Sequence, residues 1–183
     1  MYKLLSLAAA AALLTACQTT GGYQPVSDPL PKLTVTFADA AWNGAMVPAG
    51  QHCKKFGGNG ATPALTVSGI PAGANAIIVE LNDATYQPLS YDGGHGKIGF
   101  WITGGGQATL RAVPGGTKAM PAGVFLEAKN RATGGWASEG YLPPCSGGNG
   151  NMYFADVKAV YKAKSDGEAS KLLAQGRIDL GKY

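Results

Sequence analysis

The chain of 183 residues is poor in charged residues and in histidine. Only 14% of its residues are Asp, Glu, Lys or Arg, and it contains two histidines, His52 and His95. The formal charge is +4 at pH 7, and the basic residues neither form long runs nor alternate with aromatic residues. This pattern argues against a nucleic-acid partner.

The sequence also lacks the common catalytic signatures. It has no Gly-x-Ser-x-Gly elbow, no His-Glu-x-x-His pair and no phosphate-binding Gly-x-x-x-x-Gly-Lys-Ser/Thr loop. Glu80 and Asp83 flank the end of an expected strand, but such a carboxylate pair is commonly solvated and carries no acid–base assignment by itself. We therefore expect a protein that is not an enzyme, with no catalytic residue, no cofactor and no metal.

Cysteine is scarce as well, with three in the chain. The first, Cys17, follows a start with one positive charge at Lys3 and an apolar run over residues 4–14 that is too short to span a bilayer. Small residues precede Cys17, as at the cleavage site of a secretory signal. Residues 1–16 with Cys17 resemble the signal peptide and lipobox of bacterial lipoproteins, in which the cysteine is acylated and begins the mature chain. An ordinary cleaved signal is the alternative.

The segment after Cys17 has the composition of a tether. Residues 18–32 contain three prolines and little to bury, so we expect residues 17–32 to be extended and to hold a domain near a membrane. An acyl anchor needs no transmembrane helix. In the Gram-negative lipoproteins that it resembles, Gln18 in place of aspartate favours the outer membrane, facing the periplasm.

The other two cysteines, Cys53 and Cys145, are an even pair in a chain expected to reach an oxidising compartment. A disulfide between them is the leading interpretation. A metal site or a reactive thiol remains open, although His52 beside Cys53 is thin support for a metal. The chain has no Cys-x-x-Cys spacing that would indicate redox catalysis.

Residues 33–183 have the size of one domain and the pattern of an all-β sandwich. Short segments of alternating or β-branched residues are separated by turns rich in glycine, of which the chain has 28. Acidic residues at the start and a glycine at the end predict one helix over residues 166–176. We expect Phe100, Trp101 and Phe154 in the core and Trp136 at the surface. The expected strands are residues 33–37, 63–71, 76–81, 98–102, 108–112, 152–161 and 178–183.

The order of several short pieces is more specific than any one of them. A glycine-rich stretch at residues 56–65 precedes Gly-Ile-Pro at residues 69–71, and Asn82-Asp83-Ala84 follows the next strand. The chain ends on Leu-Leu-Ala-Gln-Gly at 172–176 and Gly-Lys-Tyr at 181–183. Over residues 47–183 this series resembles the phosphatidylethanolamine-binding protein family, also called the Raf-kinase-inhibitor-like family, in its bacterial branch. The resemblance implies a sandwich of two antiparallel sheets, with the C-terminal helix.

The resemblance also implies a small anion-binding pocket. The family builds it from an Asp-Pro-Asp stretch, a histidine that opens a strand, a Gly-x-x-Pro-Pro loop and a His-x-Tyr. In this chain one aspartate of the first motif is missing and the second histidine is replaced by an asparagine, which can donate a hydrogen bond but carries no charge. The expected ligand-binding residues are Asp83, His95, Gly140, Pro143, Pro144, Asn151 and Tyr153.

Taken together, these features predict a lipid-anchored protein of the cell envelope that acts as a binding or regulatory module for a small ligand with an anionic or phosphate head group. One alternative is an inhibitor that docks onto an envelope hydrolase through aromatic and glycine-rich loops around Trp136. The other is a structural lipoprotein whose degenerate pocket binds nothing.

Overall fold

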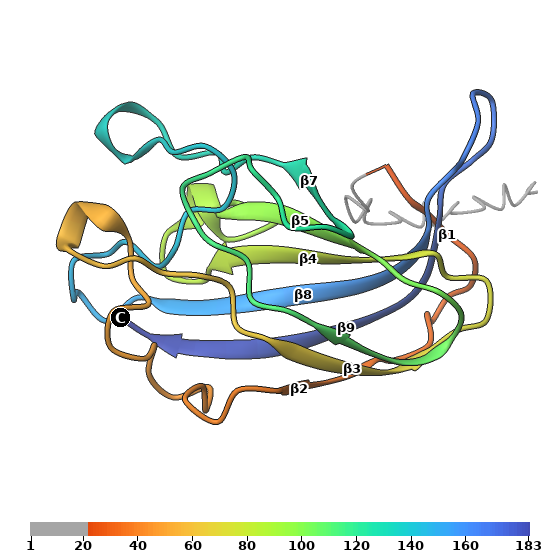
Figure 1. Cartoon of the computed structure of the whole chain (residues 1–183), viewed down its shortest axis with the longest axis horizontal. Coiled ribbons are helices and arrows are strands. Elements are labelled where there is room, and N and C mark those ends of the chain that lie inside the picture. Colours follow the sequence, from red (N-terminus) through yellow and green to blue (C-terminus); the bar gives the residue numbers. More distant parts are fainter. Residues whose placement is uncertain (1–21) are drawn as a thin grey trace, which may run out of the picture.

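The protein forms a β-sandwich of two sheets, seen in a computed structural model that describes residues 22–183 (Figure 1). The predicted signal peptide and Cys17 lie outside the described residues. The larger sheet has the strand order β1-β9-β8-β4-β5-β7 and the smaller has the order β2-β3-β6. The strands are β1 (Gln24–Pro25), β2 (Thr34–Phe37), β3 (Leu65–Ile70), β4 (Ala76–Asp83), β5 (Gly96–Trp101), β6 (Gly106–Leu110), β7 (Val124–Ala128), β8 (Met152–Tyr161) and β9 (Lys171–Lys182).

The main core lies between the two sheets, and β4 is its central strand. Ile77, Val79 and Leu81 alternate toward the smaller sheet and pack with Val67 of β3. The opposite face of β4 is buried too, because the N-terminal segment covers part of it. Burial on both faces explains why β4 reads as a nearly continuous apolar run.

The segment expected to be a tether is largely part of the domain. Tyr23 is 4% exposed and donates a hydrogen bond of 2.8 Å to Glu127. Next, β1 pairs in parallel with the start of β9. The packed segment therefore begins near Tyr23. Residues 23–32 differ from the expected mobile chain, because Tyr23 and Leu30 pack on the outer face of the larger sheet.

The predicted helix over residues 166–176 is wrong. A turn leads into β9, which begins at Lys171 and pairs antiparallel with β8 along its whole length. The side chains of Leu172 and Ala174 are buried while their neighbours are more exposed, which is the period of a strand. Local helix propensity was overridden by pairing with the long strand β8. The helical segments among the described residues are three 3-10 turns, η1 (Lys54–Phe56), η2 (Gln87–Leu89) and η3 (Gly134–Trp136).

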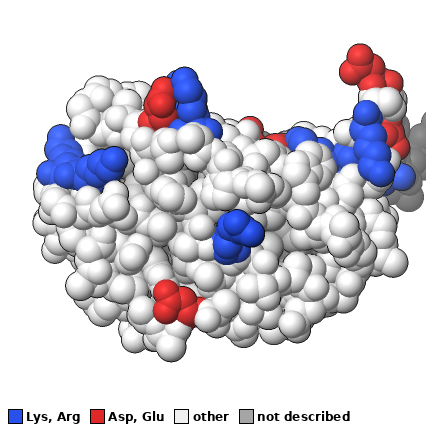
Figure 2. Space-filling model, viewed as in Figure 1, with Lys and Arg blue, Asp and Glu red and all other residues white. Residues whose placement is uncertain are grey.

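Strand alternation placed most aromatic residues correctly. Phe100 and Phe154 are each 6% exposed, as predicted, and Trp136 is 44% exposed. Trp101 was expected in the core but is 51% exposed, since the face of β5 that it shares with Lys97 points away from the smaller sheet. The protein surface has few charged side chains, and Figure 2 shows them scattered over one face. No helix in residues 22–183 is long and apolar enough to cross a membrane.

Candidate functional site

The larger of the two pockets described below opens at one end of the sandwich, where β4 ends and β8 begins. Asp83 is the last residue of β4 and pairs with Tyr153 on β8. Both residues line a cavity of about 430 Å³. Strand β1 pairs with the start of β9 (Figure 1), whereas Tyr153 pairs with Gly181 near the end of β9, so β1 and the cavity lie at opposite ends of the sandwich.

Asp83 is 3% exposed, and its carboxylate is held by three donors. The backbone N–H groups of Thr85 and Tyr86 donate to Oδ1 at 2.8 and 3.1 Å. The side-chain amide of Asn151 donates to Oδ2 at 2.7 Å. Asn151 therefore supports Asp83 and does not offer this donor to a ligand.

His95 forms the floor of the cavity and is 3% exposed. Its Nδ1 lies 2.8 Å from the carbonyl oxygen of Leu142, which can only accept, so the proton is assigned to Nδ1. Burial lowers the pKa of His95 below its ordinary value of 6.5, against the opposing effects of the Leu142 carbonyl and the charge of Asp83. The ring is thus neutral at pH 7.

The other ring nitrogen of His95, Nε2, is an unprotonated acceptor. Nε2 is buried and has no hydrogen-bond partner in residues 22–183. The other buried side-chain atom without a partner in this part of the chain is Tyr141 Oη, and Tyr141 lines neither of the two pockets described here. An unpaired buried polar atom is costly, and His95 is one of the residues that line the main cavity.

Tyr153 completes the polar floor. Its ring meets the ring of His95 edge to face, with centroids 5.3 Å apart. Its hydroxyl accepts a hydrogen bond of 3.1 Å from the Cys145 backbone N–H. Burial, and then the charge of Asp83, raise the pKa of Tyr153 to about 12, so the phenol keeps its proton at neutral pH.

The predicted Gly-x-x-Pro-Pro loop, residues 140–144, lines the main cavity through Leu142, whereas Gly140, Pro143 and Pro144 do not line it. Gly140 has φ +66°, and a Cβ there would lie 2.0 Å from the Thr117 carbonyl oxygen. The carbonyl of Pro144 accepts a hydrogen bond of 3.0 Å from the Cys53 backbone N–H. Pro143 lines a neighbouring pocket instead. The structure thus brings four of the predicted residues together around the main cavity: Asp83, His95, Asn151 and Tyr153.

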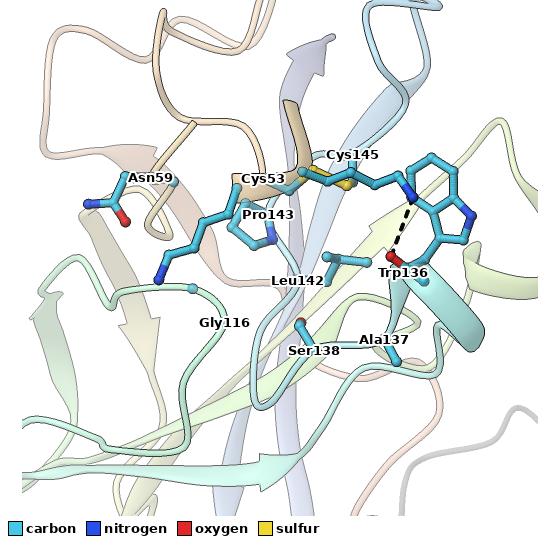
Figure 3. Close-up of a pocket in the computed structure, with 14 residues that line it drawn as sticks. Cys53, Asn59, Gly116, Trp136, Ala137, Ser138, Leu142, Pro143 and Cys145 are labelled. Atoms are coloured by element: carbon cyan, nitrogen blue, oxygen red, sulfur yellow. Dashed lines mark hydrogen bonds between the residues drawn. A yellow bond between two sulfur atoms is a disulfide. The ribbon is translucent and has the colours of Figure 1, made fainter. Parts of the chain in front are cut away.

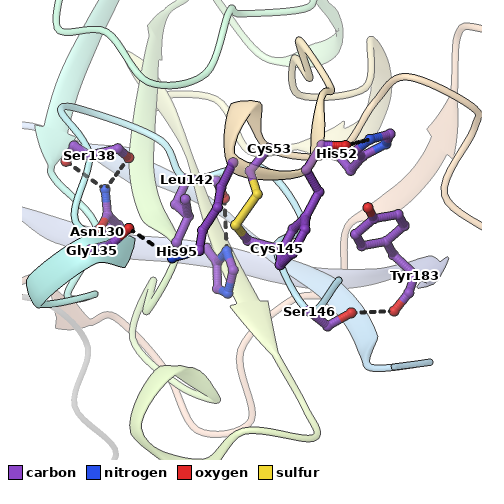
Figure 4. The surroundings of a disulfide bond; sticks show 12 residues. His52, Cys53, His95, Asn130, Gly135, Ser138, Leu142, Cys145, Ser146 and Tyr183 are labelled. Carbon is purple, nitrogen blue, oxygen red and sulfur yellow. Dashed lines mark hydrogen bonds between the residues drawn. A yellow bond between two sulfur atoms is a disulfide. The ribbon is translucent and has the colours of Figure 1, made fainter. Parts of the chain in front are cut away.

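The predicted disulfide between Cys53 and Cys145 is present, with the two Cα atoms 5.2 Å apart (Figure 4). It joins the loop before η1 to the loop before β8 and closes a separation of 92 residues. This pairing replaces the alternatives of a metal site or a reactive thiol at these cysteines. No group of three or more His, Cys, Asp or Glu side chains in residues 22–183 is arranged to hold a metal ion.

Sequence reasoning missed the residue that fixes the mouth of the cavity, Arg131. Its guanidinium donates to three backbone carbonyls, those of Pro88, Tyr91 and Asp92, at 3.1, 2.7 and 2.8 Å. It also lies over the ring of Tyr91, 4.6 Å from the centroid. Arg131 ties two loops together, and no local pattern around it signals this role.

Asn130, also missed, shapes the loop that carries Trp136. Its amide donates to the carbonyl and hydroxyl oxygens of Ser138 at 2.9 and 3.0 Å, and to the carbonyl of Gly140 at 2.9 Å. The loop places Trp136 at the mouth, where its ring meets that of Phe56 with centroids 5.8 Å apart. Tyr86, which is 53% exposed, adds a further aromatic ring to the same mouth.

A second pocket of about 240 Å³ lies beside the main cavity (Figure 3). Trp136, Leu142 and Cys145 line both pockets, so these residues form the boundary between them. The remainder of its wall comes from the loop around η1 and from glycine-rich turns.

Fold and cavity together define a two-sheet β-sandwich with a pocket at one end. This is the fold of phosphatidylethanolamine-binding proteins, as expected. YbcL of Escherichia coli, described as a new member of the mammalian family of these proteins, aligns with a TM-score of 0.50 and 20% identity over 83% of this chain and 98% of YbcL. CT736 of Chlamydia trachomatis, described as a homologue of the same proteins, gives a TM-score of 0.48 and 19% identity over 83% of this chain and 97% of its own. No protein-family model and no curated protein matches the sequence.

Proposed function

We propose that the protein is a small-ligand-binding module of the cell envelope, and that its ligand enters the main cavity. The cavity is of the size that small-molecule sites have, and it combines apolar walls with a few convergent polar groups. The ligand that fits best is a polar head group of the ethanolamine or glycerol type. Its ammonium or hydroxyl group would lie deepest in the cavity, beside His95 and Asp83.

The unpaired Nε2 of His95 carries this proposal. An acceptor needs a donor, so the ligand atom that meets Nε2 must bear a proton. Asp83 adds a negative charge nearby, and the amide of Asn151 is already bound to it. A fully ionised phosphate offers no proton to Nε2 and is repelled by the Asp83 carboxylate, whereas an ammonium or hydroxyl group suits both. The anionic part of a head group therefore does not sit on this floor.

We propose binding rather than catalysis for the same reason. In residues 22–183 no hydroxyl or thiol hydrogen-bonds to Nε2 of His95, so this candidate base has no nucleophile beside it. The hydroxyl of Ser146, which lines the cavity, instead donates to the carbonyl of Tyr183.

We further propose that Cys17 is acylated and anchors the domain in the outer membrane, facing the periplasm. The Cys53–Cys145 disulfide supports an oxidising compartment. The cavity lies at the far end of β9 from β1, about ten residues or ~33 Å along the strand. An anchor at Cys17, six residues before Tyr23, then points the cavity away from the anchoring membrane. Radiolabelled palmitate should enter the wild type and not Cys17→Ser.

Histidine NMR tests the binding proposal directly. The two histidines in the chain give two imidazole signals, and His52 serves as an internal control. The mature chain carrying Cys17→Ser retains every described residue, and its 15N-histidine form would be titrated with ethanolamine. We expect a saturable shift of the His95 Nε2 resonance while both nitrogens of His52 stay fixed. An unmoved His95 signal at saturating ethanolamine contradicts the proposal and favours a structural lipoprotein with an empty pocket.

A second candidate function is inhibition of an envelope hydrolase by docking. Trp136 and Phe56 are 44% and 39% exposed and lie together at the mouth, as an aromatic anchor for a protein interface would. A Trp136→Ala variant should then lose inhibition of periplasmic hydrolase activity while keeping the His95 response to ethanolamine. Unchanged inhibition by this variant would exclude the docking function at this surface.

A further inference from the structure

The second pocket has the opposite chemical character from the main cavity. Lys54 and Lys55 line it, and none of its lining residues is acidic. In the view of Figure 2, positive side chains gather at the left end, over the loop that contains η1. Two positive charges without a carboxylate in the wall make this pocket attractive to an anion.

Lys54 is not committed to another group in the described part of the chain. It takes part in none of the side-chain hydrogen bonds or ion pairs of residues 22–183. Lys55 lies over the ring of Trp136, 3.8 Å from the centroid, and donates a long hydrogen bond of 3.4 Å to the Gly135 carbonyl. Trp136 therefore holds one ammonium group at the pocket while the other remains available.

Ser138 adds a neutral donor. Its hydroxyl oxygen accepts a hydrogen bond from the amide of Asn130 at 3.0 Å, which leaves the hydroxyl proton free to be donated. Ser138 and Asn59 both line the pocket. Together with the lysines they form a donor set of the kind that binds the oxygens of phosphate or a carboxylate.

Glycines keep this pocket open and its wall close to the backbone. A Cβ on Gly115 would lie 2.3 Å from Cγ of Pro143, and one on Gly60 would lie 2.7 Å from Cβ of Pro143. Gly116 has φ +69°, a conformation that favours glycine. The disulfide at Cys53 fixes the residue immediately before the two lysines. These glycines and the disulfide thus fix the shape of the pocket.

We propose that the pocket of Lys54, Lys55, Asn59 and Ser138 is an oxyanion site that binds phosphate or a phosphate monoester, separate from the main cavity. The main cavity has the Asp83 carboxylate and the neutral His95 among its lining residues, whereas this pocket has two lysines and no acidic residue. The site stands on its own residues and does not depend on what the main cavity binds.

Inorganic phosphate is the probe. The mature chain with Cys17→Ser, labelled with 15N, would be titrated at constant ionic strength, with sodium chloride as the reference salt. We expect saturable amide shifts at Lys54, Gly116 and Ser138 and at the indole of Trp136. Saturable shifts centred on Asp83, His95 or Tyr153, or a response that grows linearly without saturation, would overturn the proposal.

A double variant tests the lysines. Lys54→Gln with Lys55→Gln should weaken phosphate binding at least tenfold. The control pair, Lys164→Gln with Lys171→Gln, removes the same charge from exposed positions at the other end of the sandwich and should bind as the wild type does. Equal weakening in both double variants would show a non-specific charge effect and would contradict the site. The His95 Nε2 signal in the same samples reports on the main cavity separately.

Discussion

The two pockets at the end of the sandwich share one wall and differ in what they offer a ligand. The main cavity presents the Asp83 carboxylate and the bare Nε2 of His95, both acceptors. The neighbouring pocket presents Lys54, Lys55 and the Ser138 hydroxyl, which are donors. The acceptors stand at the ends of strands β4 and β5, while the donors stand on loops. We therefore propose that the two adjacent pockets prefer different ligands, and that the preference of the lysine pocket depends on the composition of its loops.

Removal of the disulfide should have the largest effect on stability. It should also disturb both pockets, because Cys145 lines each of them. The double variant Cys53→Ser with Cys145→Ser should lower the free energy of unfolding by about 2–5 kcal/mol, since the bridge constrains a long stretch of unfolded chain. Urea unfolding measures this loss. A change below about 0.5 kcal/mol would mean that the bridge does not stabilise the fold, and that the pockets do not need it.

Asp83→Asn should have the second-largest effect on stability. It should also make the main cavity more similar to the lysine pocket in its response to phosphate. It places an amide opposite the Asn151 amide and removes the negative charge, at a cost of about 1–3 kcal/mol in unfolding free energy. Phosphate should then perturb His95 as well as Lys54. Asp156→Asn is the control, because Asp156 pairs with an exposed Arg177 and should cost at most about 1 kcal/mol. Equal costs for the two variants would contradict this account of Asp83.

The pH dependence of stability should test whether His95 is neutral in the folded protein. Because burial lowers the pKa of His95 below 6.5, the unfolded chain binds a proton that the folded chain refuses. The contribution of His95 is fully present above pH 6.5 and is lost as the pH falls below that value. Urea unfolding at pH 7.5, 6.5 and 5.5 should show a steeper loss in the wild type and in His52→Gln than in His95→Gln. The same slope in all three would contradict a buried neutral His95.

The smallest effect is expected at the lysines. Lys55→Gln removes the cation–π contact with Trp136 and should lower the unfolding free energy by about 0.5–1 kcal/mol. Lys54→Gln is the matched control and should change stability by less than about 0.5 kcal/mol, because Lys54 supports no other described side chain. A larger cost for Lys54→Gln than for Lys55→Gln would assign Lys54 a structural role.

Part of the sheet structure could be predicted from residue alternation, as for β2, where exposed and half-buried side chains alternate. Strand β8 is buried on both faces and is recognisable by its length and its apolar residues. The helix over residues 166–176 could not be excluded locally, because its acidic start and final glycine fit a helix as well as a turn and a strand. Gly176 is needed for another reason, since a Cβ there would lie 2.7 Å from the Leu33 carbonyl oxygen. That approach between distant segments has no local signal.

The main cavity was predictable to the extent that its polar residues stand at strand ends. Asp83 and His95 follow or precede apolar strands, and the structure brings them together with Tyr153. Arg131 and the lysine pocket were not predictable, because they lie in loops without periodicity whose arrangement depends on the disulfide and on backbone hydrogen bonds. The sequence also gave no sign that the Asn151 amide would be taken up by Asp83.

The most direct test of the difference between the pockets is one labelled sample titrated in parallel with ethanolamine and with inorganic phosphate. We predict two separate sets of signals: ethanolamine moves His95 Nε2 and the amides of Asp83 and Tyr153, and phosphate moves Lys54, Gly116 and Ser138. If phosphate moves His95 and leaves the lysine pocket unchanged, the assignment of donors and acceptors to the two pockets is wrong.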